Sequence, residues 1–165
     1  MTDTADDGRG GGAADDGRTG VFVAETDAER RDAFAVRRAV FVDEQGVDEA
    51  IEYDDHDEPG ADATHFVAYD DGAAVGAARL RAADETTAKA ERVAVAADRR
   101  GEGWGRDIMR TVEGTARTEG FDRLALHAQT RVREFYERLG YDAHGEEFEE
   151  AGIPHIEMSI GLDDA

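Results

Sequence analysis

Several residue types are scarce in this chain of 165 residues, and each scarcity excludes a class of protein. Cysteine is absent, which excludes a disulfide scaffold, a cysteine–zinc site and a thiol nucleophile. No apolar run approaches the ~18 residues of a membrane-spanning helix, and no charged-then-apolar signal pattern opens the chain. The length favours one domain, and we expect a cytoplasmic protein that does not enter membranes.

Lysine is nearly absent as well, since 18 of the 19 basic residues are arginine and Lys89 is the exception. Asp and Glu together number 40, and the net charge is −21. Salt at molar concentration screens such surface repulsion. We therefore expect a protein from a halophile with a saline cytosol, with an ordinary acidic protein as the alternative, and an acidic surface that does not bind nucleic acid.

The chain divides into an aperiodic beginning and a periodic remainder. Residues 1–19 are rich in Gly, Asp and Ala, which predicts a disordered acidic tail. Residues 20–165 show strand and helix periodicity and form the single predicted domain. A capping box of Thr26 and Glu29 predicts the start of the first helix.

The order of the predicted elements indicates a mixed α/β layer in which helices lie against a sheet. Thr130 is expected to cap the last helix and Gly140 to end it. The expected strands are 20–26, two within 65–81 around an Asp71-Gly72 turn, 88–97, 123–129, 141–148 and 153–162. The expected helices are 27–42, 103–120 and 131–139, and residues 43–62 are expected to form a loop, with a short helix within it as the alternative.

The stretch RRGEGWGRDIMRTVE, residues 99–113, joins a predicted strand to a predicted helix. A helix N-terminus offers unpaired N–H groups to an anion, and glycines let the backbone approach a phosphate. Four arginines against two carboxylates in 99–110 reverse the charge of the chain locally. The lysine of a Walker A loop is missing, and Arg106 replaces the last glycine of a Rossmann fingerprint. An anion site is indicated, with a solvated arginine-rich face as the alternative.

Arg100, Gly103 and Gly105 match the pattern R-x-x-G-x-G, by which the chain resembles the GNAT family of acetyl-CoA-dependent N-acetyltransferases. TRVREFYERLGY (130–141), VRRAVFVDEQGV and GEEFEEAGIPHIEM resemble the ElaA/YjcF-like subgroup, and the likeness covers roughly residues 20–162. The resemblance implies a mixed, mostly antiparallel sheet of six to seven strands, with splayed central strands and flanking helices.

The same resemblance implies direct attack of a primary amine on acetyl-CoA in a ternary complex. A backbone N–H near Val95 would stabilise the oxyanion. The pantetheine arm would lie along Val93, Ala94 and Val95, and the pyrophosphate on the turn of Arg100, Gly101, Glu102, Gly103, Trp104, Gly105 and Arg106. The alternative is a non-catalytic acyl-CoA-binding or sensor protein.

Two residues are expected to move protons. Tyr136, in the FYE of the last helix, would protonate the leaving thiolate, with core packing as its alternative. Glu91 is the first candidate for the general base, because it precedes the pantetheine strand residues, with a solvent-facing carboxylate as its alternative.

The acceptor is expected to be a small-molecule or peptide amine. Glu44, Gln45, His127 and His155 are expected to border it. The acidic loop 52–57 either suits a cationic amine or is surface charge. No histidine has metal-ligand spacing, so no metal is expected. A homodimer, frequent in the family, is an open possibility.

Overall fold

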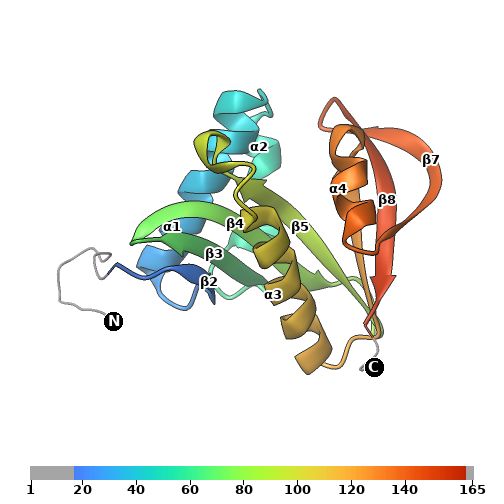
Figure 1. Ribbon diagram of the computed structural model, residues 1–165, viewed down its shortest axis with the longest axis horizontal. Helices are drawn as coiled ribbons and strands as arrows, with labels where there is room; N and C mark the ends of the chain where they lie inside the picture. The colour runs from blue at the N-terminus through green and yellow to red at the C-terminus, as the bar shows by residue number, and fades with distance from the viewer. Residues whose placement is uncertain (1–16, 163–165) are drawn as a thin grey trace.

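The structure is a computed structural model that describes residues 17–162 (Figure 1). Those residues form a seven-stranded sheet in the order β2-β3-β4-β5-β6-β8-β7. Adjacent strands are antiparallel except β5 and β6, which are parallel. The strands are β2 (Gly20–Val23), β3 (Thr64–Asp70), β4 (Ala73–Ala82), β5 (Thr87–Val95), β6 (Arg123–Gln129), β7 (Asp142–Glu150) and β8 (Ile153–Gly161).

Helices cover both faces of the sheet, as the sequence predicts (Figure 1). On one face, α3 buries Ile108 and Met109 against the larger apolar cluster, and on the other α1 buries Ala33 and Val36. The helices are α1 (Asp27–Arg37), the π-helix η1 (Arg38–Glu44), α2 (Glu49–Glu52), the 3-10 turns η2 (Asp55–Asp57), η3 (Ala97–Arg99) and η4 (Thr130–Val132), α3 (Trp104–Thr118) and α4 (Arg133–Arg138). The predicted mixed α/β architecture is confirmed.

Local signals in the sequence set several element boundaries. Thr26 Oγ1 accepts from the Glu29 N–H at 3.1 Å, and the Glu29 carboxylate accepts from the Thr26 N–H at 3.1 Å, so the capping box is confirmed. The Asp71-Gly72 turn has the positive φ values, 52° and 83°, that a tight hairpin requires. The predicted cap at Thr130 is wrong, because Thr130 opens a 3-10 turn and α4 begins at Arg133 without a side-chain cap.

Most of the predicted tail, residues 1–16, lies outside the described residues. Its last residues contact the sheet: Arg18 O accepts from the Gly72 N–H at 2.8 Å, and Thr19 Oγ1 from the Asp71 N–H at 2.9 Å. The guanidinium of Arg18 also lies 4.6 Å from the centre of the Tyr69 ring. The chain therefore contacts the fold two residues before the predicted start of the domain.

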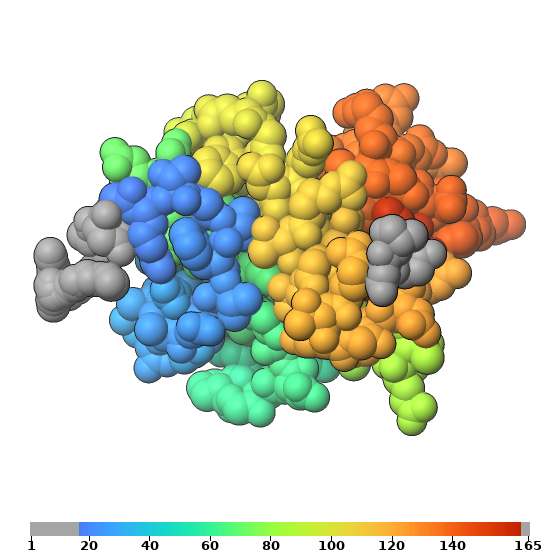
Figure 2. Space-filling view, turned by 60° about the horizontal axis from the view of Figure 1, so that its bottom comes forward, coloured from blue at the N-terminus to red at the C-terminus, as the bar shows by residue number. Residues whose placement is uncertain are grey.

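The two halves of the sheet meet closely at one end and diverge at the other. Figure 2 shows the molecule with its lower end turned forward, where the gold α3 segment lies between blue N-terminal and red C-terminal segments and the β4–β5 turn projects. In Figure 1, β5 and β8 separate toward the top, with α2 and α4 on either side of the opening. Every helix within residues 17–162 is too short or too polar to cross a membrane.

Candidate active site

The candidate site lies where the central strands separate. β5 pairs with β6 over four residues, Thr87–Ala90 against Arg123–Leu126, and the strands diverge beyond them. A cleft of about 640 Å³ opens there, lined by residues from both faces of the sheet. The predicted splay of the central strands is thus present.

A β-bulge accompanies the separation. The β4–β5 register shifts between Ala77 and Arg79, so that Arg92 and Val93 on β5 together oppose Ala78 on β4. Arg92 has φ 57°, in the left-handed region. A bulge bends its strand and increases the local twist, which directs the end of β5 away from β6.

The end of β5 turns one backbone edge to the cleft. The Ala96 N–H donates to Val75 O at 2.9 Å, so alternation directs the N–H and C=O of Val95 away from β4. Arg100 Nε accordingly donates to Val95 O at 3.0 Å from the cleft side. The same alternation turns the polar groups of Ala94 back to β4. Of the three predicted pantetheine residues, Val95 therefore has a clearly open edge and Ala94 does not.

The glycine turn precedes α3 as predicted. Gly101 and Gly103 have φ values of 83° and 95°, which side chains rarely adopt. The Asp107 N–H is the first to bond within the helix, to Gly103 O at 3.1 Å. The N–H groups of Trp104, Gly105 and Arg106 therefore remain open at the helix start, where no side chain caps them.

Side chains around this turn have different orientations. Arg99, Arg100 and Arg106 line the cleft. Glu102 does not, because its exposed carboxylate accepts from Arg99 Nε at 3.1 Å and Trp104 Nε1 at 3.2 Å.

The end of the π-helix bridges the two walls of the cleft. Glu44 accepts from Arg100 at 2.7 and 2.8 Å, so this predicted acceptor residue is bound to the glycine-turn side and does not line the cleft. Gln45 does line it, and its Oε1 accepts from Gln129 Nε2 on β6 at 2.8 Å. π-Helical segments are rare and often occur at functional sites.

Tyr136 packs in the core and also lines the cleft. Its ring is 6% exposed and packs edge-on against Phe135 and Tyr141, with centroids 4.9 and 5.7 Å away. The residue lines the cleft, and its hydroxyl has no hydrogen-bond partner among residues 17–162. Burial raises the pKa of Tyr136. Gly105 lets α3 approach this helix, since a Cβ there would lie 3.0 Å from the Phe135 ring.

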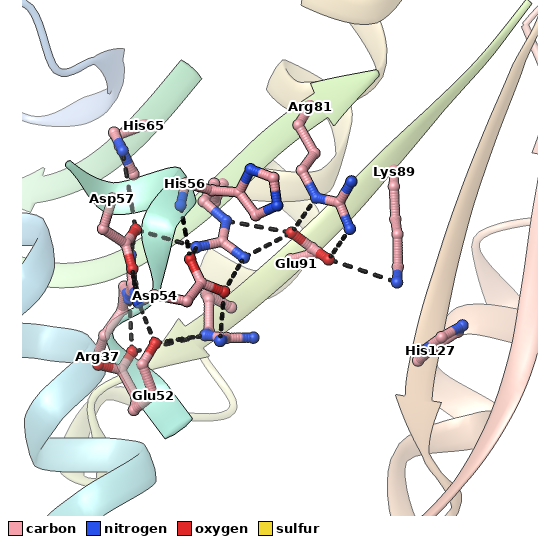
Figure 3. A network of polar contacts seen from close by, with 12 residues as sticks. Arg37, Glu52, Asp54, His56, Asp57, His65, Arg81, Lys89, Glu91 and His127 are labelled. Atoms are coloured by element: carbon pink, nitrogen blue, oxygen red, sulfur yellow. Dashed lines mark hydrogen bonds and ion pairs between the residues drawn. The ribbon is translucent and has the colours of Figure 1, made fainter. Parts of the chain in front are cut away.

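Glu91 lines the cleft but is held by cations (Figure 3). Its carboxylate accepts from Arg79 at 2.6 Å and Arg81 at 2.8 Å, and Lys89 Nζ lies 3.4 Å away. Although burial raises the pKa of Glu91, the hydrogen bonds from Arg81 and Arg79 lower it to about 2. A carboxylate of this pKa is a poor base, so the environment argues against the predicted role. The solvent-facing alternative also fails, because the side chain is 11% exposed.

The acidic loop belongs to a buried ion-pair network, which corrects both of its interpretations (Figure 3). Arg37, fully buried in the apolar stripe of α1, donates to Asp57 at 2.7 Å and to Glu52 at 2.6 Å. Arg79 donates to Asp54 at 2.6 Å and to Asp57 at 3.0 Å. The carboxylates of Glu52, Asp54 and Asp57 are therefore bound by arginines and are not free for a cationic amine, whereas Asp55 is exposed. Composition does not show this network, although the spacing of Arg37 from Ala33, four residues along α1, puts it on the same helix face as the apolar residues.

Both predicted histidines line the cleft. His127 Nδ1 lies 2.8 Å from Glu150 Oε1, and its ring meets the Phe148 ring edge-on at 5.0 Å. His155, 7% exposed, donates from Nδ1 to Ile153 O at 2.7 Å. Within residues 17–162, no group of three or more His, Asp or Glu side chains is arranged to hold a metal ion.

The parted central strands, the glycine turn at the helix start and the cleft between them define the acetyltransferase class of the GNAT type. The sequence matches the acetyltransferase (GNAT) domain family over residues 25–162, and the chain belongs to this family. The predicted family is thereby confirmed, and the chain is an acyltransferase by family.

Relatives agree with the predicted subgroup. The uncharacterized N-acetyltransferase YjcF of Bacillus subtilis is 39% identical over 139 residues, covering 84% of this chain and 96% of YjcF. Escherichia coli ElaA has a TM-score of 0.74 at 27% identity, covering 86% of this chain and 99% of ElaA. An acyl-CoA N-acyltransferase from Pseudomonas aeruginosa has a TM-score of 0.74 at 28% identity, with the same coverage of 86% and 99%.

Proposed function

We propose that this protein transfers the acetyl group of acetyl-CoA to the primary amine of a small molecule or peptide, by direct attack in a ternary complex. The observation that supports this proposal most directly is the cleft between β5 and β6, which is lined by residues from both faces of the sheet. Leu126 and Tyr136 lie on the α3–α4 side, and Glu91 and His127 on the other. Two substrates can therefore meet from opposite faces.

The α3 side fits coenzyme A. The open edge of Val95 suits the amides of a pantetheine arm, which would take the bond now made by Arg100. The open N–H groups from Trp104 to Arg106 suit a pyrophosphate, and neighbouring arginines add positive charge. Val95 N–H is our candidate for the oxyanion donor.

We assign Tyr136 as the acid that protonates the leaving thiolate. Because burial raises its pKa, the hydroxyl stays protonated at neutral pH and can donate to the departing sulfur. Its unpartnered position on the cleft, within the described part of the chain, supports this role.

The acceptor half favours a neutral or anionic molecule that carries an amine over a polycationic amine. Two of the carboxylates that line it are already compensated, Glu91 by arginines and Glu52 by Arg37, and the third, Glu150, accepts a hydrogen bond from His127. Lys89, 20% exposed, adds a positive charge at the same wall. We further infer from the net charge of −21 that the enzyme works in the cytoplasm at high salt.

Calorimetry with acetyl-CoA and a thiol-release assay over an amine panel, both in molar KCl, test the function. Gly103→Val is expected to weaken acetyl-CoA binding at least tenfold. Gly120→Val is the matched control, since Gly120 has φ 93° at the opposite end of the same helix and open space around it. Equal affinity of both variants for acetyl-CoA would contradict the proposed pyrophosphate site at the glycine turn. Binding without thiol release on any amine would favour the sensor alternative, and absence of binding would refute both.

A further inference from the structure

We propose that His127, held by Glu150, is the general base that removes the proton of the acceptor amine. The proposal rests on the proposed acetyl transfer and assigns the proton acceptor that Glu91 does not supply. It makes His127 a catalytic residue and Glu150 a positioning residue.

The contacts of His127 fix which nitrogen can accept a proton. A carboxylate only accepts, so Nδ1 donates to Glu150 Oε1 over 2.8 Å and the lone pair of the neutral ring is on Nε2. The edge contact with Phe148 at 5.0 Å holds the ring plane. Nε2 has no partner within residues 17–162, and the side chain is 29% exposed on the cleft.

The position of His127 places it at the separation of the strands. Leu126 forms the last β6 pair with β5, opposite Ala90, so His127 is the first residue beyond it. Alternation directs Leu126 into the α3-side core and His127 to the other face. Figure 3 shows His127 across the gap from Lys89 and Glu91, without an interaction to their network. Tyr136, on the α4 side, is thus separated from the base by the plane of the sheet.

The charged groups around His127 come from three strands. Glu150 on β7 contacts Nδ1, and Glu157 on β8 is the residue paired directly opposite His127. On β5, Lys89 lies beside Glu91, whose charge is compensated by its arginines. The contacting carboxylate therefore stabilises the charge that His127 gains when it accepts a proton.

The other histidine on the cleft is less suited to this role. His155 is 7% exposed and donates Nδ1–H to a backbone carbonyl, which carries no full charge to stabilise an imidazolium. The proposed step is balanced within the site. The amine nitrogen bonds to the thioester carbonyl carbon, the carbon–sulfur bond breaks, His127 Nε2 takes the amine proton, and the sulfur receives one from Tyr136.

The test measures thiol release between pH 5.5 and 9 with the panel amine of highest kcat/KM. His127→Asn is expected to lower kcat by about 10²–10⁴, with unchanged acetyl-CoA affinity by calorimetry. It should also remove the acid-side fall in kcat/KM that is due to His127, leaving the fall due to amine protonation. Imidazole in the buffer should restore activity to His127→Ala.

Two further variants separate positioning from packing. Glu150→Gln should lower kcat without raising KM, because glutamine Oε1 can still accept from His127 Nδ1 but carries no charge to stabilise the imidazolium formed in the reaction. His144→Asn is the control: His144 contacts Ser159 on the same sheet, does not line the cleft and should keep the wild-type profile.

Outcomes of this experiment separate the two proposals. A wild-type enzyme that turns over, together with a His127→Asn variant whose kcat and pH profile are unchanged, overturns the base alone. A wild-type protein that binds acetyl-CoA without releasing thiol overturns acetyl transfer and the base together.

Discussion

Asp57 is the carboxylate at the centre of the buried network, and its removal gives the strongest prediction for stability. Its side chain is fully buried and accepts from Arg37 at 2.7 and 2.8 Å and from Arg79 at 3.0 Å. Asp57→Ala leaves two buried guanidinium groups without this partner. Breaking a buried ion pair from one side costs about 3–5 kcal/mol. This loss is a large part of a total stability of about 5–15 kcal/mol.

Urea denaturation in molar KCl, followed by circular dichroism, measures that loss. Asp55→Ala is the matched control, because Asp55 is exposed in the same 3-10 turn and forms no ion pair with any residue in the range 17–162. Its effect should stay within about 0.5 kcal/mol. Asp57→Asn keeps the shape but not the charge, and should lose most of what the alanine variant loses. A cost below about 1 kcal/mol for Asp57→Ala would refute the reasoning.

Three further predictions concern pH, catalysis and salt. Burial lowers the pKa of His65 to about 4, so the contribution of His65 to stability is complete above about pH 6.5 and is lost as the pH falls toward 4. Roughly 3 kcal/mol of unfolding free energy should disappear over this window. His65→Asn should abolish this pH dependence in urea titrations carried out at a series of pH values. Tyr136→Phe should lower kcat about 100-fold without changing acetyl-CoA affinity by calorimetry, and an unchanged kcat would remove its assigned role. The melting temperature should rise between 0.1 and 2 M KCl, because salt screens the net charge of −21; a constant melting temperature would contradict the inferred adaptation.

Features encoded by neighbouring residues could be predicted from the sequence. The Thr26 capping box, the Asp71-Gly72 turn and the apolar stripe of α3 depend on spacings of one to four residues. The glycine turn was recognised in the same way, from Arg100 to Gly105. These signals fixed the order of the elements and, through the family resemblance, the location of the cleft.

Partners distant in the chain could not be predicted. The place of Glu91 just before the expected pantetheine residues predicts a base. The pKa of Glu91 is instead set by Arg79 and Arg81 on β4, which the sequence does not show to be its partners. Glu44 is separated from Arg100 by 56 positions, and their pairing holds Glu44 at the glycine turn. Charge counts do not show which charges are buried together. The acidic loop is therefore wrongly predicted, because its partners Arg37 and Arg79 are distant from it in the chain.

The buried network and the cleft are connected through Arg92. As a non-glycine residue with φ 57°, Arg92 carries a strain of about 1–2 kcal/mol. Its guanidinium donates to Glu52 O at 2.9 Å, Ile51 O at 3.1 Å and Asp54 at 3.1 Å, which offsets that strain. The acidic segment that Asp57 fastens to Arg37 therefore also anchors the bulge.

The bulge in turn determines which groups face the cleft. Before it, Ala90 packs on the α3 side; after the extra residue, Val93 and Val95 return to that side while Ala94 packs on the α1 side. The open backbone edge of Val95 thus depends on the change in side-chain alternation at the bulge, where Arg92 is bound by the acidic segment on the opposite face of the sheet. The buried arginines and carboxylates are thus connected to the bulge, and through it to the residues that line the cleft.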